Sequence, residues 1–451
     1  MEGGVTAIPT PARTGGDSAS AEIESLNSEG DGVAHIEGKA TFIHGALPGE
    51  SVRFRYHNKR KRYDTGATVE ILRASPDRVV PPCAYFGVCG GCGLQHYAAA
   101  PQLKAKEKVL LDTLAHIAKV TPAEISPPLT GPAWHYRRKA RLGVRVVPKK
   151  GGVIVGFRER RSSFITPLAF CHVLDENIAR LLPHLRELVG GLSCPNRVPQ
   201  IEVAVGDNAK ALIFRHLEAF TPADLAQLTA FGETHTVQMY LQPSDTASVH
   251  ALWPASPPAL EYALPENVTL RFAPTDFVQV NAELNRKMIA RALELLAPTA
   301  QDRVLDLFCG LGNFTLPLAR RAAQVLGIEG DAALVARAQA NAQRNGIANA
   351  AFLTADLYDA AGLQALAPSL WAQPWDKLLL DPPRTGAMEV LTQLPATPPR
   401  RLLYISCYPG TLARDAEYLV HVRGYRLQTA GVMDMFPQTT HVESLALFEH
   451  Q

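Results

Sequence analysis

The thiol of Cys407 is the side chain of this sequence with the clearest chemical potential. It lies in Ser406-Cys407-Tyr408-Pro409, directly after the apolar, strand-like run at 401–405. A single cysteine is more often a small buried hydrophobic residue than a reactive one. In open α/β sheets, however, ligands bind beyond the carboxyl ends of the strands, and other predicted strand ends nearby carry polar residues. We therefore interpret Cys407 as a candidate nucleophile within a larger site.

Three acidic residues near successive predicted strands indicate a nucleoside cofactor. The first strand, which contains Asp306, leads into a loop with Gly310 and Gly312. The loop resembles a dinucleotide fingerprint but has Thr315 in place of its third glycine, which weakens a phosphate-binding interpretation. Glu329 ends the next strand, where a carboxylate can accept hydrogen bonds from ribose hydroxyls. Asp356 follows the third strand, and we expect it near the adenine end of the ligand.

The motif Asp381-Pro-Pro-Arg384 follows the fourth predicted strand of the same region. Two prolines build a rigid turn that offers no backbone N–H donor. An aromatic residue after the prolines would suit stacking beside an exocyclic amine. Arg384 occupies that position here and indicates a different target for the reaction.

A second cluster of cysteines has the spacing of a metal site. Cys83, Cys89 and Cys92 form C-x5-C-x2-C among glycines that let the chain wrap closely, and Cys171 is the best candidate for a fourth ligand. Zinc and an iron–sulfur cluster both accept four thiolates, so the spacing does not choose between them. We expect Cys194 and Cys309, which join no cluster, to be structural.

The composition is that of an intracellular globular protein with several domains. A chain of 451 residues exceeds one ordinary core, and 47% hydrophobic with 20% charged residues is typical of soluble proteins. We find neither a run of about 18 apolar residues nor a secretory signal, so we expect a cytoplasmic protein without a membrane span. Seven cysteines, an odd number, favour a reducing compartment over a disulfide framework. No obligate protein partner is evident.

Changes of pattern along the chain predict three domains after a disordered tail at 1–17. Residues 18–76 contain five short alternating apolar runs, which predict a small OB-like β-barrel. Residues 77–284 have a mixed α+β pattern and contain the four clustered cysteines. Residues 285–451 repeat strand, loop and helix, which predicts a doubly wound, mostly parallel α/β sheet.

Three basic segments flanked or interrupted by aromatic residues indicate a nucleic-acid partner. They are residues 59–62 (Lys-Arg-Lys-Arg), 135–141 and 158–161. One such segment could be no more than a solvated hairpin tip, whereas three favour RNA or DNA over an acidic small molecule. We expect the clusters around Arg60, Arg137 and Arg160 to hold a nucleic-acid backbone.

Taken together, these motifs resemble the RNA uracil-5-methyltransferase family, from about residue 18 to the C-terminus. Within that family the resemblance is to the members that act on 23S ribosomal RNA and carry a TRAM domain at the N-terminus. It rests on the barrel, the four cysteines and six motifs, at 276–281, 306–313, 381–384, 406–407, 411–415 and 441–444.

The resemblance implies a fold, cofactors and site residues. It implies a Rossmann-like class I methyltransferase domain that uses S-adenosylmethionine, a TRAM barrel, and a [4Fe-4S] cluster rather than zinc at Cys83, Cys89, Cys92 and Cys171. The cofactor would be held by Gln279, Phe308, Asn313, Glu329 and Asp356, with Asp381 near the target uracil.

The implied reaction requires both a thiol and a carboxylate. Carbon 5 of uracil is a poor nucleophile until a thiolate adds at carbon 6, and Cys407 would supply that activation. Glu443 is the candidate base that then removes the proton from carbon 5. Tyr408 is a departure, because the family commonly has asparagine there.

Several other functions remain open at the level of sequence. The same chemistry could act on another ribosomal or transfer RNA uridine. A non-catalytic RNA-binding iron–sulfur protein would tolerate loss of Cys407. An amino-group methyltransferase needs no thiol, and a nicotinamide-dependent oxidoreductase is disfavoured by the broken glycine fingerprint.

Overall fold

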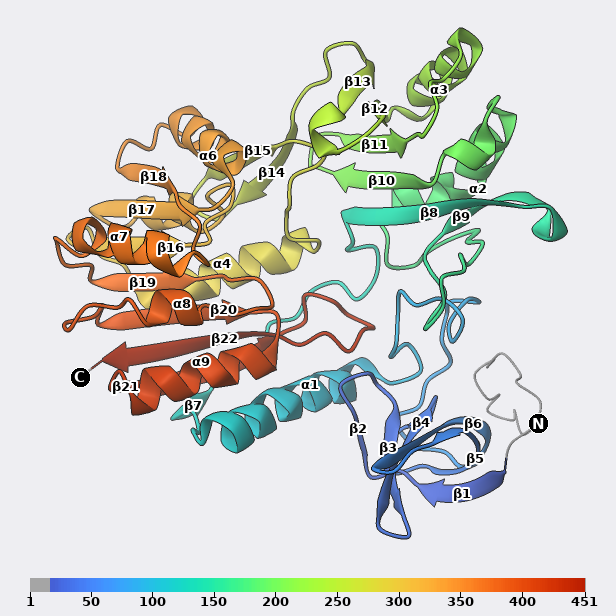
Figure 1. Cartoon of the computed structure of the whole chain (residues 1–451), viewed down its shortest axis with the longest axis horizontal. Helices are drawn as coiled ribbons and strands as arrows, with labels where there is room; N and C mark the ends of the chain where they lie inside the picture. Colours follow the sequence, from blue (N-terminus) through green and yellow to red (C-terminus); the bar gives the residue numbers. More distant parts are fainter. Residues whose placement is uncertain (1–16, 451) are drawn as a thin grey trace.

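The computed structural model describes residues 17–450 (Figure 1). A small N-terminal barrel, a central sheet and a large C-terminal sheet follow one another along the chain. The disordered tail predicted for residues 1–17 lies outside the described residues, apart from Asp17. No helix in the part that the structure describes is long and apolar enough to cross a membrane.

The N-terminal barrel is built from the five segments in which the sequence predicts strands, the first of them broken in two. Its sheet has the order β1-β5-β6-β4-β3-β2. Because β1 and β2 follow each other in the chain but lie at opposite ends of this order, the first segment pairs at both edges and closes the barrel. The strands are β1 (Ser18–Glu22), β2 (Ser25–Leu26), β3 (Gly32–Ile36), β4 (Lys39–His44), β5 (Ser51–Lys59) and β6 (Tyr63–Arg73).

The central sheet has the order β13-β12-β11-β10-β8-β9, and the helices α2 and α3 pack against it. Asp175 caps α2 by accepting hydrogen bonds from two backbone N–H groups of its first turn, and Thr221 forms a capping box on α3. The elements are β8 (Lys139–Val147), β9 (Gly152–Gly156), α2 (Glu176–Gly191), β10 (Gln200–Val205), β11 (Lys210–Arg215), α3 (Pro222–His235), β12 (Gln238–Gln242) and β13 (His250–Trp253).

The C-terminal sheet confirms the predicted doubly wound arrangement. Its order is β18-β17-β16-β19-β20-β22-β21-β7, and only β22 runs against its neighbours. The strands are β16 (Arg303–Leu307), β17 (Gln324–Glu329), β18 (Ala350–Thr354), β19 (Lys377–Leu380), β20 (Arg401–Ser406), β21 (Tyr425–Met433) and β22 (Glu443–His450). The seven predicted strands therefore form, with ends shifted by two residues at most.

Helices cover both faces of this sheet, because side chains of one strand alternate between two cores. Leu378 and Leu380 point into one core, and Leu379 between them points into the other. The first core also holds α1, α7, α8 and α9, and the second holds α4, α5 and α6. The helices are α4 (Ala282–Leu296), α5 (Thr315–Ala319), α6 (Ala332–Arg344), α7 (Ala360–Leu370), α8 (Met388–Leu391) and α9 (Pro409–His421).

A segment that the sequence groups with the central domain packs on the C-terminal sheet instead. Helix α1 (Ala99–Thr113) and the π-helical turn η1 (Leu114–Ala118) lie against α9, and β7 (Glu124–Ile125) pairs in parallel with the outer strand β21. The hairpin of β14 (Leu260–Leu264) and β15 (Val268–Phe272) shares a core with α4 and α6. A single boundary at residue 284 therefore does not separate the two packed units, since the chain enters the C-terminal unit twice.

Candidate active site

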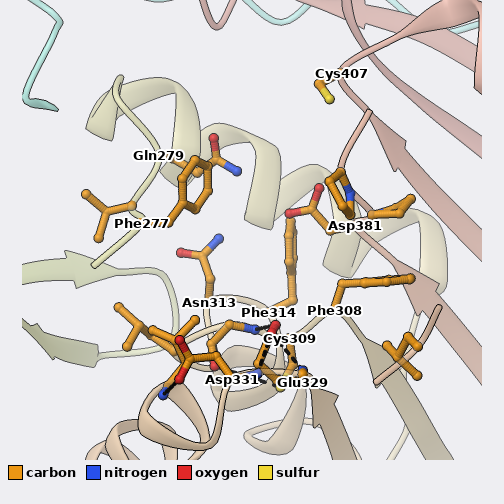
Figure 2. Close-up of a pocket in the computed structure, with 18 of the residues that line it drawn as sticks. Phe277, Gln279, Phe308, Cys309, Asn313, Phe314, Glu329, Asp331, Asp381 and Cys407 are labelled. Carbon is orange, nitrogen blue, oxygen red and sulfur yellow. Dashed lines mark hydrogen bonds between the residues drawn. The ribbon is translucent and has the colours of Figure 1, made fainter. Parts of the chain in front are cut away.

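One cavity of about 610 Å³ lies at the carboxyl ends of the C-terminal sheet. Figure 2 shows its lining, with Cys407 at one end and Glu329 at the other. The structure brings all eight residues of the predicted catalytic and cofactor site to this cavity: Gln279, Phe308, Asn313, Glu329, Asp356, Asp381, Cys407 and Glu443. A volume of this size suits a ligand of cofactor dimensions.

The loop after β16 forms the floor of the cavity through an unusual backbone path. Phe308 has a left-handed φ of 64°, rare for a residue with a bulky side chain, and Gly312 has a φ of 87°, which favours glycine. The Phe308 ring lies 5.6 Å from that of Tyr358, centroid to centroid. Thr315, in place of a third glycine, donates a hydrogen bond to Asp306, and burial raises the pKa of that carboxyl to about 7. Thr315 therefore pairs with one oxygen of a buried acid, whose Oδ1 has no hydrogen-bond partner in the described chain.

Glu329 is held rigidly at the end of β17. Its carboxylate accepts hydrogen bonds from the backbone N–H groups of Gly310 at 3.1 Å, Gly330 at 2.8 Å and Asp331 at 3.2 Å. Asp331 then caps α6 by accepting from Ala333 N at 2.7 Å. This network fixes the acid in one orientation, as recognition of a diol requires.

Three polar residues outside β17 complete this end of the cavity. Asn313 exchanges two amide hydrogen bonds with Asn285 of α4, at 2.9 and 3.0 Å, so its orientation is fixed from outside its own loop. Asp356 follows β18 and accepts a hydrogen bond from Tyr358 N at 2.9 Å. Gln279 comes from the segment that precedes α4, and it faces the cavity in Figure 2.

The other end of the cavity contains the thiol and two carboxyl groups. Asp381 directly follows β19 and Cys407 directly follows β20, while Glu443 begins β22. Ser406 is paired with Ser444 in the antiparallel ladder of β20 and β22, so the register places Cys407 and Glu443 across from each other at the ladder's end. Residues 36 apart in sequence thus become neighbours.

Burial raises the pKa of all three groups, and like charge adds to the shift at Glu443 and Cys407. Burial raises the pKa of Asp381 to about 7. Burial, followed by the charge of Asp381, raises the pKa of Glu443 to about 8, against the opposing effects of Arg384 and Lys106. Burial and the charges of Glu443 and Asp381 raise the pKa of the Cys407 thiol to about 11. Such groups gathered in one cavity are typical of a reaction centre.

Tyr408, the departure from the family pattern, is half exposed and is not among the residues that line the cavity. Its ring packs over Gly410, where an added Cβ would lie 2.8 Å from the ring. Its backbone N–H donates to Ser406 Oγ at 3.1 Å. The side chain therefore lies against the start of α9, beside the cavity rather than in it.

Sequence reasoning missed several lining residues, among them Phe277, Asp331, Tyr358, Phe436 and His441. Phe277 and His441 lie inside motifs already singled out, and Asp331 precedes an apolar helical run as a capping residue does. Phe436 carried no signal, because its role depends on a loop between two strands. Cys309, expected to be structural, is buried but also borders the cavity.

The four clustered cysteines line one small, separate pocket between the cysteine loop and the central sheet. Burial raises the pKa of Cys89 to about 11 and of Cys92 to about 12, and the neighbouring thiols contribute to both shifts. Among residues 17–450, no group of three or more histidine, cysteine or acidic side chains is arranged so that it could hold a metal ion. The four cysteines thus share one pocket.

Comparison with known proteins assigns the family. A family model described as tRNA (Uracil-5-)-methyltransferase matches residues 264–451, and a TRAM domain model matches residues 13–56. The chain is 51% identical to the 23S rRNA (uracil(1939)-C(5))-methyltransferase RlmD of Aromatoleum aromaticum over 434 residues, 95% of this chain and 99% of that protein. It is 52% identical to the RlmD protein of an Azoarcus species over the same shares.

The solved structures support the fold. The tRNA (uracil-54, C5)-methyltransferase of Pyrococcus abyssi, solved in complex with S-adenosyl-L-homocysteine, superimposes with a TM-score of 0.72 at 22% identity, covering 95% of this chain and all of that one. At this identity the likeness shows a shared fold, which includes the Rossmann-like methyltransferase sheet. With half of its residues identical to those of full-length relatives, the chain belongs to the RNA uracil-5-methyltransferase family.

Proposed function

We propose that this protein methylates carbon 5 of a uridine in 23S ribosomal RNA, at position 1939, with S-adenosylmethionine as methyl donor. Position 1939 is named for the relatives at 51% and 52% identity, and the N-terminal barrel favours the same branch of the family. The observation that carries the proposal is that a thiol, two carboxyl groups and a nucleoside-type pocket share one cavity.

The Glu329 end of the cavity suits the methyl donor. Glu329 would accept hydrogen bonds from the ribose hydroxyls, while Asp356 and the Phe308 ring would contact the adenine. Asn313 and Gln279 would hold the amino-acid end, which turns the sulfonium towards Cys407. When bound, S-adenosylmethionine would supply the electrophilic methyl group.

The Cys407 end suits a uracil that is turned out of its stack. The Cys407 thiolate adds to carbon 6, which makes carbon 5 nucleophilic, and carbon 5 then takes the methyl group. Glu443 removes the proton from carbon 5, the electron pair restores the ring double bond, and the thiolate leaves. Because the thiol is protonated in the free pocket, adduct formation accelerates as pH rises towards its pKa of about 11.

The RNA would contact two basic surfaces. One is the tip between β5 and β6, where Lys59 lies 4.3 Å from the centre of the Tyr56 ring. The other is a groove of about 560 Å³ on the central domain, lined by Arg145 and Arg158 among others. Both of these arginines are exposed, and neither forms an ion pair within residues 17–450. They are therefore available to phosphate groups.

Arg160 and Arg161, expected to hold RNA, have another partner. Arg160 Nη2 lies 3.0 Å from Asp31 Oδ1 of the barrel, and Arg161 Nη2 lies 2.7 Å from Asp31 Oδ2. Asp31 is buried, and burial opposes its charge while His44 and both arginines together lower its pKa. These two arginines fix the barrel to the central domain.

For the four cysteines we propose a [4Fe-4S] cluster. The ligands of one zinc ion surround a single point, whereas the cluster spreads its four thiolates over four irons. The four thiols share one pocket, as either centre requires, and the resemblance to the RNA uracil-5-methyltransferase family favours the cluster. The Thr166 hydroxyl is buried and has no oxygen or nitrogen partner in the described chain, and its interaction with Cys89 lowers the pKa of that thiol. A hydroxyl in this position can donate a hydrogen bond to a cysteine sulfur.

A covalent trap tests the reaction. With S-adenosylmethionine and 23S RNA fragments that contain 5-fluorouridine, the protein should form a stable adduct, because fluorine cannot be removed as a proton. Denaturing gels and mass spectrometry of the Cys407 peptide measure it. The absence of an adduct, or an adduct that persists in Cys407→Ala, would refute the proposal.

The cluster has a separate test. An anaerobic preparation should be brown and contain about four iron and four sulfide per chain. A colourless preparation with one zinc per chain would exclude the cluster without affecting the methylation proposal.

A further inference from the structure

The loop between β21 and β22 brings three residues to the cavity, namely Phe436, His441 and the base Glu443. This loop comprises residues 434–442. Because each ordered residue costs backbone entropy of about 1–2 kcal/mol, the side chains of such a loop are ordered only if other groups hold it. Most of the contacts that hold this loop come from outside the C-terminal strands. They come from the segment 93–106, which begins directly after Cys92 and continues into α1.

Gln438 is the centre of these contacts. Its carbonyl oxygen accepts hydrogen bonds from the backbone N–H groups of both Gly93 and Leu94, each at 2.9 Å. Its side-chain Oε1 accepts from Gln102 Nε2 at 3.1 Å. Gln438 is buried and has a left-handed φ of 67°, a conformation that its surroundings must enforce.

Gln102 links the cysteine loop to Gln438. Its buried amide nitrogen also lies 3.0 Å from Leu94 O and 2.6 Å from Tyr97 O. One side chain therefore fixes both the segment after the cysteines and the loop that leads to Glu443. Replacing this amide by an apolar group would leave buried acceptors unpaired, and each costs roughly 1–3 kcal/mol.

Lys106 and Tyr136 hold the rest of the loop. Lys106 Nζ lies 2.7 Å from Asp434 Oδ1 and 3.1 Å from Phe436 O, and its side chain is 3% exposed. Tyr136 donates to Pro437 O at 3.0 Å. Four of the five residues from Asp434 to Gln438 are thus held by α1, by the segment after Cys92 or by the start of the central domain.

We propose that the segment 93–106, with Gln102 at its centre, positions Glu443 for removal of the carbon 5 proton, so that the cysteine loop supports the second half of the reaction. This inference rests on the proposed role of Glu443. The loop that carries Cys83, Cys89 and Cys92 thereby has a function in the reaction, although this loop lies outside the cavity. Gln102 is a positioning residue, because it touches neither substrate nor cofactor.

The test is the variant Gln102→Met, which keeps the volume and removes the donor. A misplaced base slows proton removal but leaves the earlier addition and methyl transfer intact. We expect kcat to fall on the order of 10²-fold. We also expect a methylated covalent complex to accumulate on ordinary uridine RNA, as in Glu443→Gln, with adduct formation on 5-fluorouridine RNA changed less than about threefold.

A matched control is Gln238→Met in β12, which also removes a buried amide donor, here to Pro258 O at 2.8 Å. This control should turn over like the parent protein. The inference is overturned if Gln102→Met also turns over like the parent, or if its adduct formation falls together with its turnover. If Glu443→Gln itself accumulates no complex, the proposed role of Glu443 is at fault instead.

Discussion

The two ends of the cavity differ in how their polar groups are satisfied. At the cofactor end, Glu329 accepts three backbone hydrogen bonds and Asn313 is paired with Asn285. At the target end, the carboxyl groups of Asp381 and Glu443 accept no hydrogen bond from the described chain, and burial raises the pKa of each. The carboxylate of the first end is already hydrogen-bonded by the chain, whereas the carboxyl groups of the second end receive no hydrogen bond from the described residues.

This difference separates binding from reactivity. Fixed, satisfied acceptors recognise a ligand without changing it, and they contribute mainly to affinity. Buried carboxyl groups without partners are costly to the fold and are kept where a reaction needs a group that can exchange a proton. Substitutions at the two ends should therefore affect different measured quantities.

The largest expected effect is at the target end. Cys407→Ala should lower methylation by about 10³-fold or more, because the covalent activation of carbon 5 is lost. The Kd for S-adenosylhomocysteine, measured by calorimetry, should change less than about twofold. A large loss of cofactor affinity in this variant would show that the two ends are not separate.

A smaller effect is expected at the cofactor end, and it should change the affinity for the cofactor rather than the methylation rate. Glu329→Gln keeps one acceptor oxygen but loses the charge that strengthens its hydrogen bonds. We expect the Kd for S-adenosylhomocysteine to rise about tenfold. The methylation rate at saturating S-adenosylmethionine should stay within about threefold of the parent. A fall in that rate with unchanged affinity would place Glu329 in the chemistry instead.

The last expected effect concerns stability rather than activity. The folded protein binds a proton at Glu443 more tightly than the unfolded chain does, since the pKa rises from 4.5 to about 8. The parent therefore loses stability as pH increases through this window, by at most about 1.4 kcal/mol per pH unit, and no further above it. Glu443→Gln removes that loss.

Thermal unfolding of the two proteins measures this difference. The Tm advantage of Glu443→Gln should grow from pH 4.5 to about 8 and then stay constant. Glu449→Gln, on the same strand but outside the cavity, serves as the control. An advantage independent of pH would mean that burial does not shift the titration of Glu443.

Local patterns predicted much of this molecule. Alternating and continuous apolar runs predicted the strands of the barrel and of the C-terminal sheet, because strand formation follows from side-chain periodicity. The strand ends in turn predicted that Glu329, Asp356 and Cys407 belong to one site, and all three line one cavity, whereas Glu443 followed from the family resemblance. The glycine-rich loop after β16 was also identifiable, since it needs residues that tolerate a left-handed backbone.

Long-range pairing was not accessible in the same way. No local pattern shows that β7 pairs with β21, or that Gln102 contacts Gln438. Each of these residues is compatible with the local structure of its own segment, so the neighbouring sequence does not identify its distant partner. Arg160 and Arg161 illustrate the limit, since a basic run looks the same whether it binds phosphate or a buried Asp31.

The sequence by itself thus determined the strands of the barrel and of the C-terminal sheet and the polar residues at the strand ends, including Cys407, because periodicity and strand order constrain them locally. Only the tertiary structure decided the pKa values of Asp381, Cys407 and Glu443. It alone also decided which residues hold the loop that leads to Glu443. Both depend on burial and on contacts between segments hundreds of residues apart, such as Lys106 with Asp434. Such contacts form only when the whole chain has folded.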